Sequence, residues 1–249
     1  MVNRVPSGIY GLDELIEGGF PEKRNVLISG ACGTGKSIFC IQYLYKGAVE
    51  YGEPGLFVTF DESPYKIRED MMKFGWDLKT LEKSGDFRMV DASVTRVGMV
   101  SDEETSITPG IFDFDQIALE IMKVIRESGA KRVAIDSLPA MALHLKDNAE
   151  IRRSMFRLAL LLSKADVTAL MTSEIPEQSL SAGQPMNFSK YGVEEYIADG
   201  VLLLNYLGVG SQSTRTLYIR KMRSTAHSPD IHPMEITKEG IVVKKVEEY

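Results

Sequence analysis

The stretch Gly30-Ala31-Cys32-Gly33-Thr34-Gly35-Lys36-Ser37 decides the fold, because it fits the phosphate-binding pattern G-x-x-x-x-G-K-[ST] at every fixed position. The glycines let the backbone turn so that successive N–H groups point at phosphate oxygens. Lys36 would bring its charge to the β- and γ-phosphates, and the Ser37 hydroxyl would bind Mg²⁺. The apolar run 26–29 predicts a strand before the loop, and Ile38 lies in a helix whose positive N-terminal end would face the anion. The chain is therefore predicted to bind a nucleoside triphosphate with magnesium.

Outward from this loop, the sequence alternates between short apolar runs and amphipathic stretches, a pattern typical of a mostly parallel sheet covered on both faces. Strands are expected at 55–60, 87–91, 132–136 and 167–172, and helices at about 63–74, 112–128 and 149–165. Polar stretches at 92–111 and 175–188 predict long loops. From Gly200 the pattern changes to strands joined by short turns, at 201–206, 216–222, 233–237 and 241–246. We expect one α/β domain over residues 1–249, with a central mostly parallel sheet flanked by helices and antiparallel C-terminal strands.

Composition indicates a soluble protein. Hydrophobic residues make up 44% of the chain and charged residues 26%, which is ordinary for a globular domain. The two cysteines, Cys32 and Cys40, form no metal-ligand pattern and favour a reducing compartment. No apolar run is long enough for a membrane span, so a cytoplasmic location without membrane association is predicted. The net charge of −6 disfavours broad attraction to nucleic acid, although a local basic channel stays open as an alternative.

Two further carboxylate positions indicate chemistry on the nucleotide. Asp136 ends the apolar strand 132–136, where its carboxylate can hold Mg²⁺ beside the phosphate loop. Asp61 and Glu62 follow the strand 55–60, a natural place for the carboxylate that orients and deprotonates the attacking water. The simpler interpretation of each position is helix capping, and Ser63 before Pro64 does look like a cap and first helical residue. Capping and catalysis are compatible here.

A cationic pair lies far along the chain from the phosphate loop. Lys221 and Arg223 are two residues apart, so on an extended strand both side chains point the same way. They could reach a γ-phosphate across a subunit interface. Spacing alone slightly favours the simpler interpretation, an exposed strand end with solvated charges.

Several ordered motifs resemble the KaiC-like ATPases of the RecA superfamily. Besides the phosphate loop, these are PSGIYGLDEL (6–15), GGFP (18–21), FVTFDESP (57–64), FGWDL (74–78), YGVEE (191–195) and KMRSTAH (221–227). The resemblance covers nearly the whole chain. It implies a ring, usually a hexamer, that binds ATP between neighbouring subunits.

The resemblance also implies roles for individual residues. One subunit would hold the phosphates with its loop and Mg²⁺ with Ser37 and Asp136, and Lys36 would act as the catalytic cation. The adjacent subunit would contribute nucleotide contacts from residues that follow the family pattern: Lys221, Arg223, Thr225 and His227, with Thr237 and Lys238 at further nucleotide-contact positions.

The chain departs from the family pattern in two places. The family often has Glu-Glu where this chain has Asp61-Glu62, and the shorter Asp side chain holds its carboxylate back by about one C–C bond, roughly 1.5 Å. Hydrolysis is therefore expected to be slow or to depend on Glu62, and the base assignment stays open between the two. The stretch 189–196 also lacks the Ser-Thr pair that the two-domain clock protein phosphorylates, so autokinase activity is not expected.

Three functions follow as alternatives. The first is an oligomeric ATPase whose hydrolysis drives or times a conformational change in a protein partner not identifiable from the sequence. The second is a recombination-type module that uses ATP to hold DNA; it is disfavoured because the loop 175–188 has little basic or aromatic character before Phe188. The third, raised by Asp61, is a nucleotide-gated scaffold with little turnover.

Overall fold

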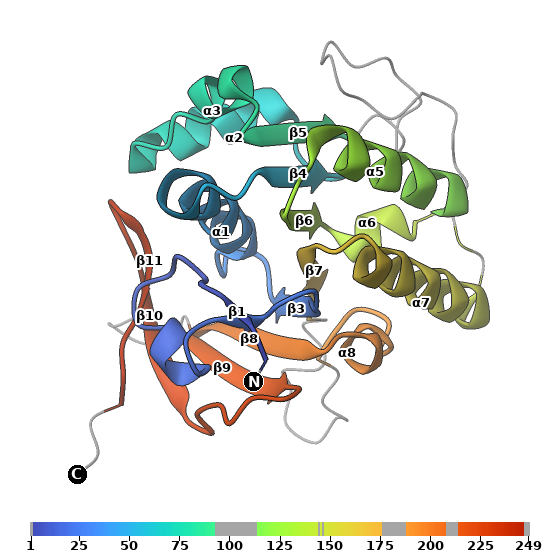
Figure 1. The fold of residues 1–249 in the computed structure, drawn as a ribbon. Coiled ribbons are helices and arrows are strands. Elements are labelled where there is room, and N and C mark those ends of the chain that lie inside the picture. Colours follow the sequence, from blue (N-terminus) through green and yellow to red (C-terminus); the bar gives the residue numbers. More distant parts are fainter. Residues whose placement is uncertain are drawn as a thin grey trace.

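The centre of the molecule is a nine-stranded sheet (Figure 1) in the order β11-β10-β9-β8-β3-β7-β6-β4-β5. The computed structural model describes residues 2–92, 114–143, 145, 147–175, 188–207 and 214–246. The strands are β3 (Asn25–Gly30), β4 (Gly55–Thr59), β5 (Phe87–Asp91), β6 (Arg132–Asp136), β7 (Thr168–Glu174), β8 (Gly200–Leu207), β9 (Thr214–Met222), β10 (Ile231–Thr237) and β11 (Gly240–Val243). From β8 to β5 in this order every neighbouring pair is parallel, whereas β9, β10 and β11 pair antiparallel. The predicted fold class is confirmed.

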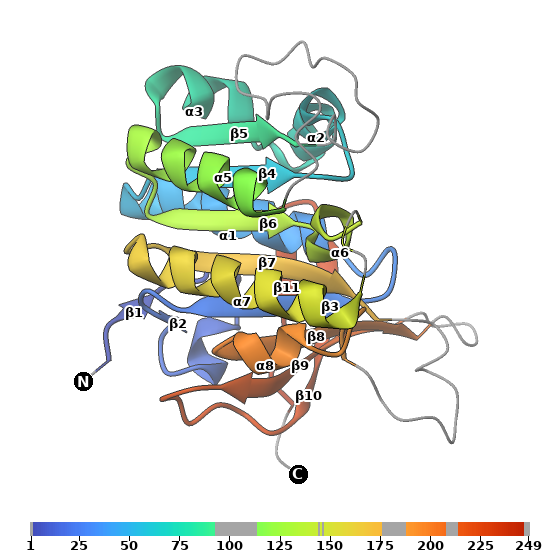
Figure 2. The same ribbon diagram turned by 90° about the vertical axis from the view of Figure 1, so that its right-hand side faces the viewer.

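Helices cover both faces of the sheet. They are α1 (Lys36–Tyr51), α2 (Pro64–Met71), α3 (Leu78–Ser84), α5 (Phe114–Ser128), α6 (Leu138–Met141), α7 (Asn148–Lys164) and α8 (Glu194–Ile197), with short 3₁₀ turns η1 (Asp13–Leu15) and η2 (Met72–Phe74). Figure 2 shows α5 and α7 side by side on one face, with α1 on the other. The sequence of β3 explains this: Leu27 packs in the cluster with α5 and α7, and Val26 and Ile28 pack in the cluster with α1. Because both faces of the sheet are covered, the side chains of β3 that point to either face are mostly apolar.

Several elements differ from the sequence prediction. The predicted helix 63–74 is divided into α2 and η2, and Gly75, with φ of +75°, ends it. The short helix α3 follows because the Asp77 carboxylate accepts a hydrogen bond from the Thr80 N–H. The short helix α6 and the two-stranded ribbon of β1 (Arg4–Val5) and β2 (Phe20–Pro21) were also not predicted. Most of both predicted loops, 93–111 and 176–187, lies outside the described residues.

The contact between α1 and β6 is unusually close and involves a buried cation. Arg132 is fully buried, pairs with Glu53 at 2.6 Å, and donates from Nη1 to the backbone carbonyls of Pro6 and Tyr43. Its guanidinium also lies 4.7 Å from the centre of the Tyr43 ring. Gly47 of α1 makes room for it, since a Cβ there would lie 2.3 Å from the Arg132 Cδ. The helix that leaves the phosphate loop is thereby fixed to the sheet.

Candidate nucleotide-binding site

A cleft of about 750 Å³ opens where the parallel strands end. Its lining residues come from the phosphate loop, the segments after β4 and β6, the end of β7, strands β9 and β10, and α2 with η2. They are Cys32, Gly33, Gly35, Lys36, Ser37, Ile38, Ile41, Asp61, Glu62, Ile67, Asp70, Met71, Lys73, Phe74, Asp136, Ser137, Glu174, Arg215 and Ile236. The C-terminal edge of a parallel sheet is the usual ligand position in α/β proteins. The structure thus gathers most of the predicted phosphate, metal and catalytic residues in one place.

The phosphate loop lies between β3 and α1, as its sequence predicted. Gly35 has a φ of +101°, a left-handed conformation that turns the chain into α1 and is strained for any other residue. Gly30 admits no side chain, because a Cβ would lie 2.4 Å from the Leu204 carbonyl oxygen. The Lys36 ammonium donates to the carbonyls of Gly30 and Ala31 at 2.9 and 3.0 Å, so its charge sits within the loop. This backbone geometry and this cation fit a polyphosphate chain.

Ser37 and Asp136 meet at the floor of the cleft. The hydroxyls of Ser37 and Thr172 hydrogen-bond to the Asp136 carboxylate, the latter at 2.5 Å. Burial raises the Asp136 pKa, and these hydroxyls together with Lys36 act against the rise. A hydroxyl and a carboxylate are the hard oxygen ligands that Mg²⁺ takes. Within the described residues no three or more His, Cys, Asp and Glu side chains cluster as metal ligands, so the ion would complete its shell from phosphate and water.

Asp61 and Glu62 stand at the exposed rim of the same cleft. Asp61 accepts a hydrogen bond from the Ser137 hydroxyl at 2.8 Å, which orients its carboxylate towards the end of β6. The pKa of Glu62 is raised, first by partial burial of its carboxyl and then by the negative charges of Asp136, Asp70 and Asp61. A carboxyl with a raised pKa is a better proton acceptor, which suits a general base.

Arg215 is a cleft residue that sequence reasoning missed. It comes from β9, where it pairs with Tyr206 of β8, and its guanidinium lies 4.5 Å from the centre of the Tyr206 ring. One nitrogen, Nη2, donates to the Gly33 carbonyl at 3.5 Å, and the buried Nε has no hydrogen-bond partner in the described structure. No motif marks this arginine. Only the strand pairing of β9 brings it to the phosphate loop.

Lys221, Arg223, Thr225 and His227 lie at the other end of the sheet from the cleft. Val26 at the start of β3 pairs with Gly200 and Gly200 with Met222, whereas the phosphate loop follows Gly30 at the end of β3. Four residues of strand separate Val26 from Gly30, or about 13 Å at 3.3 Å per residue. One chain therefore cannot bring this cationic group to its own phosphate loop without refolding the sheet.

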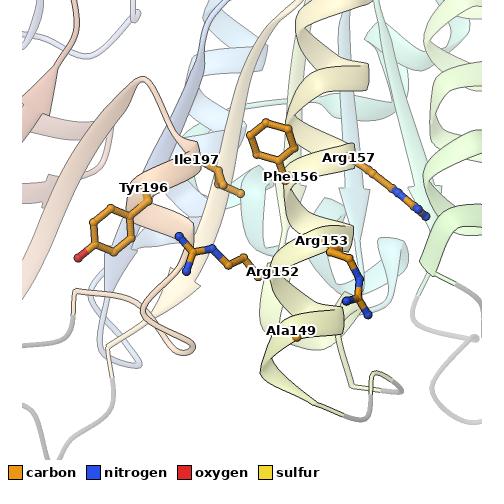
Figure 3. Close-up of a pocket in the computed structure, with 7 residues that line it drawn as sticks. All are labelled: Ala149, Arg152, Arg153, Phe156, Arg157, Tyr196 and Ile197. Atoms are coloured by element: carbon orange, nitrogen blue, oxygen red, sulfur yellow. The ribbon is translucent and has the colours of Figure 1, made fainter.

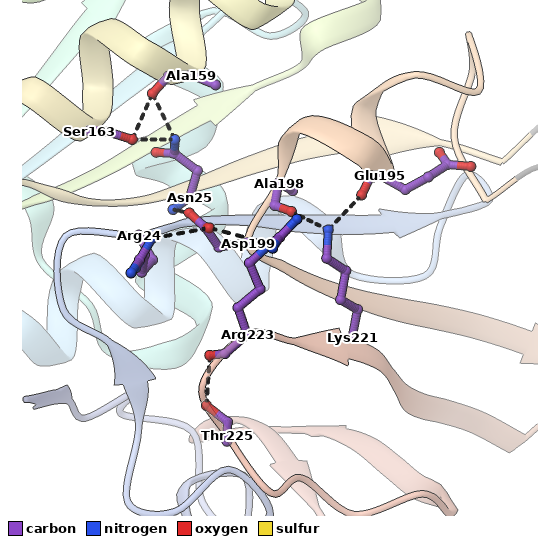
Figure 4. A network of polar contacts seen from close by, with 10 residues as sticks. All are labelled: Arg24, Asn25, Ala159, Ser163, Glu195, Ala198, Asp199, Lys221, Arg223 and Thr225. Atoms are coloured by element: carbon purple, nitrogen blue, oxygen red, sulfur yellow. Dashed lines mark hydrogen bonds and ion pairs between the residues drawn. The ribbon is translucent and has the colours of Figure 1, made fainter. Parts of the chain in front are cut away.

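Figure 4 shows how the chain holds these cations. The Lys221 ammonium donates to the carbonyls of Glu195 and Ala198 at 3.1 and 2.6 Å, and burial lowers its pKa. The Arg223 guanidinium is 3.8 Å from the Asp199 carboxylate and its side chain is 61% exposed. Thr225 donates to the Arg223 carbonyl, and His227 Nδ1 lies 2.9 Å from the Ser228 carbonyl oxygen.

Thr237 and Lys238 lie at the turn between β10 and β11. The adjacent Ile236 lines the cleft of the same chain, and a Cβ on Gly35 would lie 3.1 Å from its Cδ1. The resemblance predicted that Thr237 and Lys238 act on a neighbour's nucleotide. The structure places them beside the cleft of their own chain. Contact with a neighbour's nucleotide therefore stays a prediction.

Comparison with known proteins agrees with this geometry. The family model for the KaiC ATPase matches residues 5–248. The chain belongs to the KaiC ATPase family. It is 39% identical over 242 residues to a UPF0273 protein of Methanocaldococcus jannaschii, covering 97% of this chain and 96% of that protein. Its structure is also similar to that of a KaiC-like protein from Pyrococcus horikoshii, with a TM-score of 0.82 and 41% identity, covering 98% of this chain and all of the other.

The circadian clock oscillator protein KaiC of Parathermosynechococcus lividus is also similar, at 39% identity over 235 residues. The match takes in 94% of this chain but 41% of the clock protein. Family membership and the phosphate loop together support ATP binding by this RecA-like P-loop domain. No helix in the described part of the chain is long and apolar enough to cross a membrane.

Proposed function

We propose that this KaiC-family chain hydrolyses ATP with Mg²⁺ at sites shared between neighbouring copies of a ring of six. The observation that carries the proposal is the split of the predicted site: the loop and carboxylates lie at one end of the sheet, and Lys221 and Arg223 at the other. Copies arranged head to tail would bring the two ends together, and such arrangements close into rings.

Each residue group has a defined task in the reaction. The loop N–H groups and Lys36 would bind and orient the phosphates, and Ser37 with Asp136 would hold Mg²⁺, which would neutralise phosphate charge. Asp61 or Glu62 orients a water for attack on the γ-phosphorus and accepts its proton, so that ADP leaves as the P–O bond breaks. Arg223 and Lys221 of the adjacent copy would stabilise the charge on the transferring phosphoryl group. Hydrolysis would then change the contact between copies and could be sensed by a protein partner.

Phosphate release by the purified chain tests the proposal, with Lys36→Ala as the control and with light scattering to follow size. We expect magnesium-dependent turnover by a ring-sized species, lost in the control and unchanged by single-stranded DNA. Stimulation by DNA would support a recombination-type module instead. Tight ATP binding without turnover would indicate a nucleotide-gated scaffold.

A further inference from the structure

A cationic groove lies between α7 and α8, away from the cleft. We call it the α7–α8 groove; it measures about 560 Å³ and is lined by Ala149, Arg152, Arg153, Phe156, Arg157, Tyr196 and Ile197. Figure 3 shows Arg152 reaching from α7 towards Tyr196, with Phe156 and Ile197 beside it. Phe156 is 60% exposed and Tyr196 70% exposed, so two aromatic side chains face solvent together. Exposed aromatic groups rimmed by charge are typical of a protein-binding surface.

The groove is joined to the cationic end of the sheet through α8. The carbonyls of Glu195 and Ala198 at the two ends of this helical turn hold the Lys221 ammonium, while Tyr196 and Ile197 of the same turn line the groove. Lys221 and the groove therefore share one short helix. Any copy whose nucleotide lies near Lys221 must also come close to the groove.

The cleft end of the sheet carries a surface of matching character. Tyr65, Glu69 and Met72 are spaced i, i+4 and i+7 along α2 and η2 and so share one face, which we call the α2 face. Tyr65 is 64% exposed and Met72 55% exposed. Lys73 lies four residues after Glu69 and so borders the same face, where it pairs with Asp70 at 2.5 Å. The α2 face thus combines two exposed apolar side chains with the Glu69 carboxylate, has Lys66 and Lys73 beside it, and adjoins the carboxylate rim of the cleft.

We infer that the α7–α8 groove binds the α2 face of the adjacent copy. Arg152 and Arg153 would meet the Glu69 carboxylate, and the exposed aromatic groups of the groove would cover Tyr65 and Met72. Opposite charges across such an interface fix its register and exclude wrong partners. This inference rests on the proposed function, since it names the surfaces that would bring Arg223 to a neighbour's ATP.

The test uses two variants on opposite faces and one matched control. Arg152→Glu/Arg153→Glu reverses the charge of these two groove positions, and Tyr65→Asp/Met72→Asp places negative charge on the α2 face. The control, Lys123→Glu/Arg126→Glu, makes the same change of charge on exposed residues of α5 that do not line the groove. Size is measured by light scattering with Mg-ATP, nucleotide binding with a fluorescent ATP analogue, and folding by circular dichroism.

We expect both interface variants to be single chains that still fold and bind the analogue, while the control keeps the wild-type ring. Turnover in the two variants should fall by about 100-fold or more, because an arginine supplied by a neighbour contributes about 10³-fold or more in related phosphoryl transfers. A ring in either variant would overturn the inference and leave the proposed function intact. A wild-type protein that stays a single chain with Mg-ATP would overturn the ring itself, and the inference with it.

Discussion

Arg215 reaches the phosphate loop from the antiparallel part of the sheet, and its buried Nε faces no protein acceptor in the described structure. We expect Arg215→Ala to weaken ATP binding by about 10- to 100-fold, since a charge-assisted hydrogen bond contributes about 1.5–3 kcal/mol. Titration with a fluorescent ATP analogue would measure this. Arg220→Ala is the matched control, because Arg220 lies on the same strand and is exposed. Equal affinity in Arg215→Ala and wild type would remove Arg215 from the site.

Glu62 lies among other carboxylates that raise its pKa. If Glu62 is the base, turnover needs its deprotonated form, so the rate falls as the pH drops through this raised pKa. Asp70→Asn removes one of the negative charges, and the acid limb of the pH–rate profile should then move to lower pH. Glu69→Gln, which removes the neighbouring negative charge, is the control and should leave the acid limb at its wild-type pH. An acid limb that is identical in Asp70→Asn and wild type would argue for Asp61 as the base.

Helix α1 owes its position to the contact between Gly47 and Arg132. Alanine is normally a better helix former than glycine by about 1 kcal/mol. Here we expect Gly47→Ala to lower the free energy of unfolding by about 1–3 kcal/mol, because the added methyl group overpacks against a buried guanidinium. Urea denaturation measures the change. Val49→Ala, on the exposed side of the same helix, should have little effect, and a stabilised Gly47→Ala protein would contradict the packing argument.

Elements with a strong local signal were predicted from the sequence, and elements that depend on distant contacts were not. The apolar run of β3, the fixed pattern of the phosphate loop and the helix α1 follow one another directly, and the structure has all three where expected. The helix α6 has four residues, too few to show a helical repeat of apolar positions. The hydrogen bond by which Ser137 caps it is seen only in the structure. The β1–β2 ribbon pairs segments too short to carry an alternating pattern.

At the scale of the whole molecule, the site residues with a local sequence signal were again predictable, and those placed by distant strand contacts were not. Ser37, Asp136, Asp61 and Glu62 could be placed together because parallel strands end at one edge of a sheet. Arg215 could not, since its place depends on which residue of β8 it pairs with in the antiparallel register. The separation of Arg223 from the phosphate loop also needed the strand directions and registers, because sequence distance does not say at which end of the sheet a strand finishes.

That separation predicts complementation between inactive chains. Asp61→Asn/Glu62→Gln removes the carboxylates at one end of the sheet, and Arg223→Ala removes the cation at the other. In an equal mixture that reassembles at random, half the clefts keep their carboxylates and half of these face an intact Arg223, so about a quarter of the wild-type rate should return. Phosphate release after mixing with Mg-ATP measures it. Each variant alone is the control, and a mixture no faster than the separate variants would mean that Arg223 does not act across the interface.

Under the proposed function, half a site at each end of one sheet would also make specific activity depend on protein concentration. A linear row of n copies has n−1 complete sites, and one further site forms when the row closes, without another chain being added. Dilution would therefore lower the rate per chain, so that the total rate falls more steeply than the protein concentration. Turnover would be switched by assembly before any substrate became limiting.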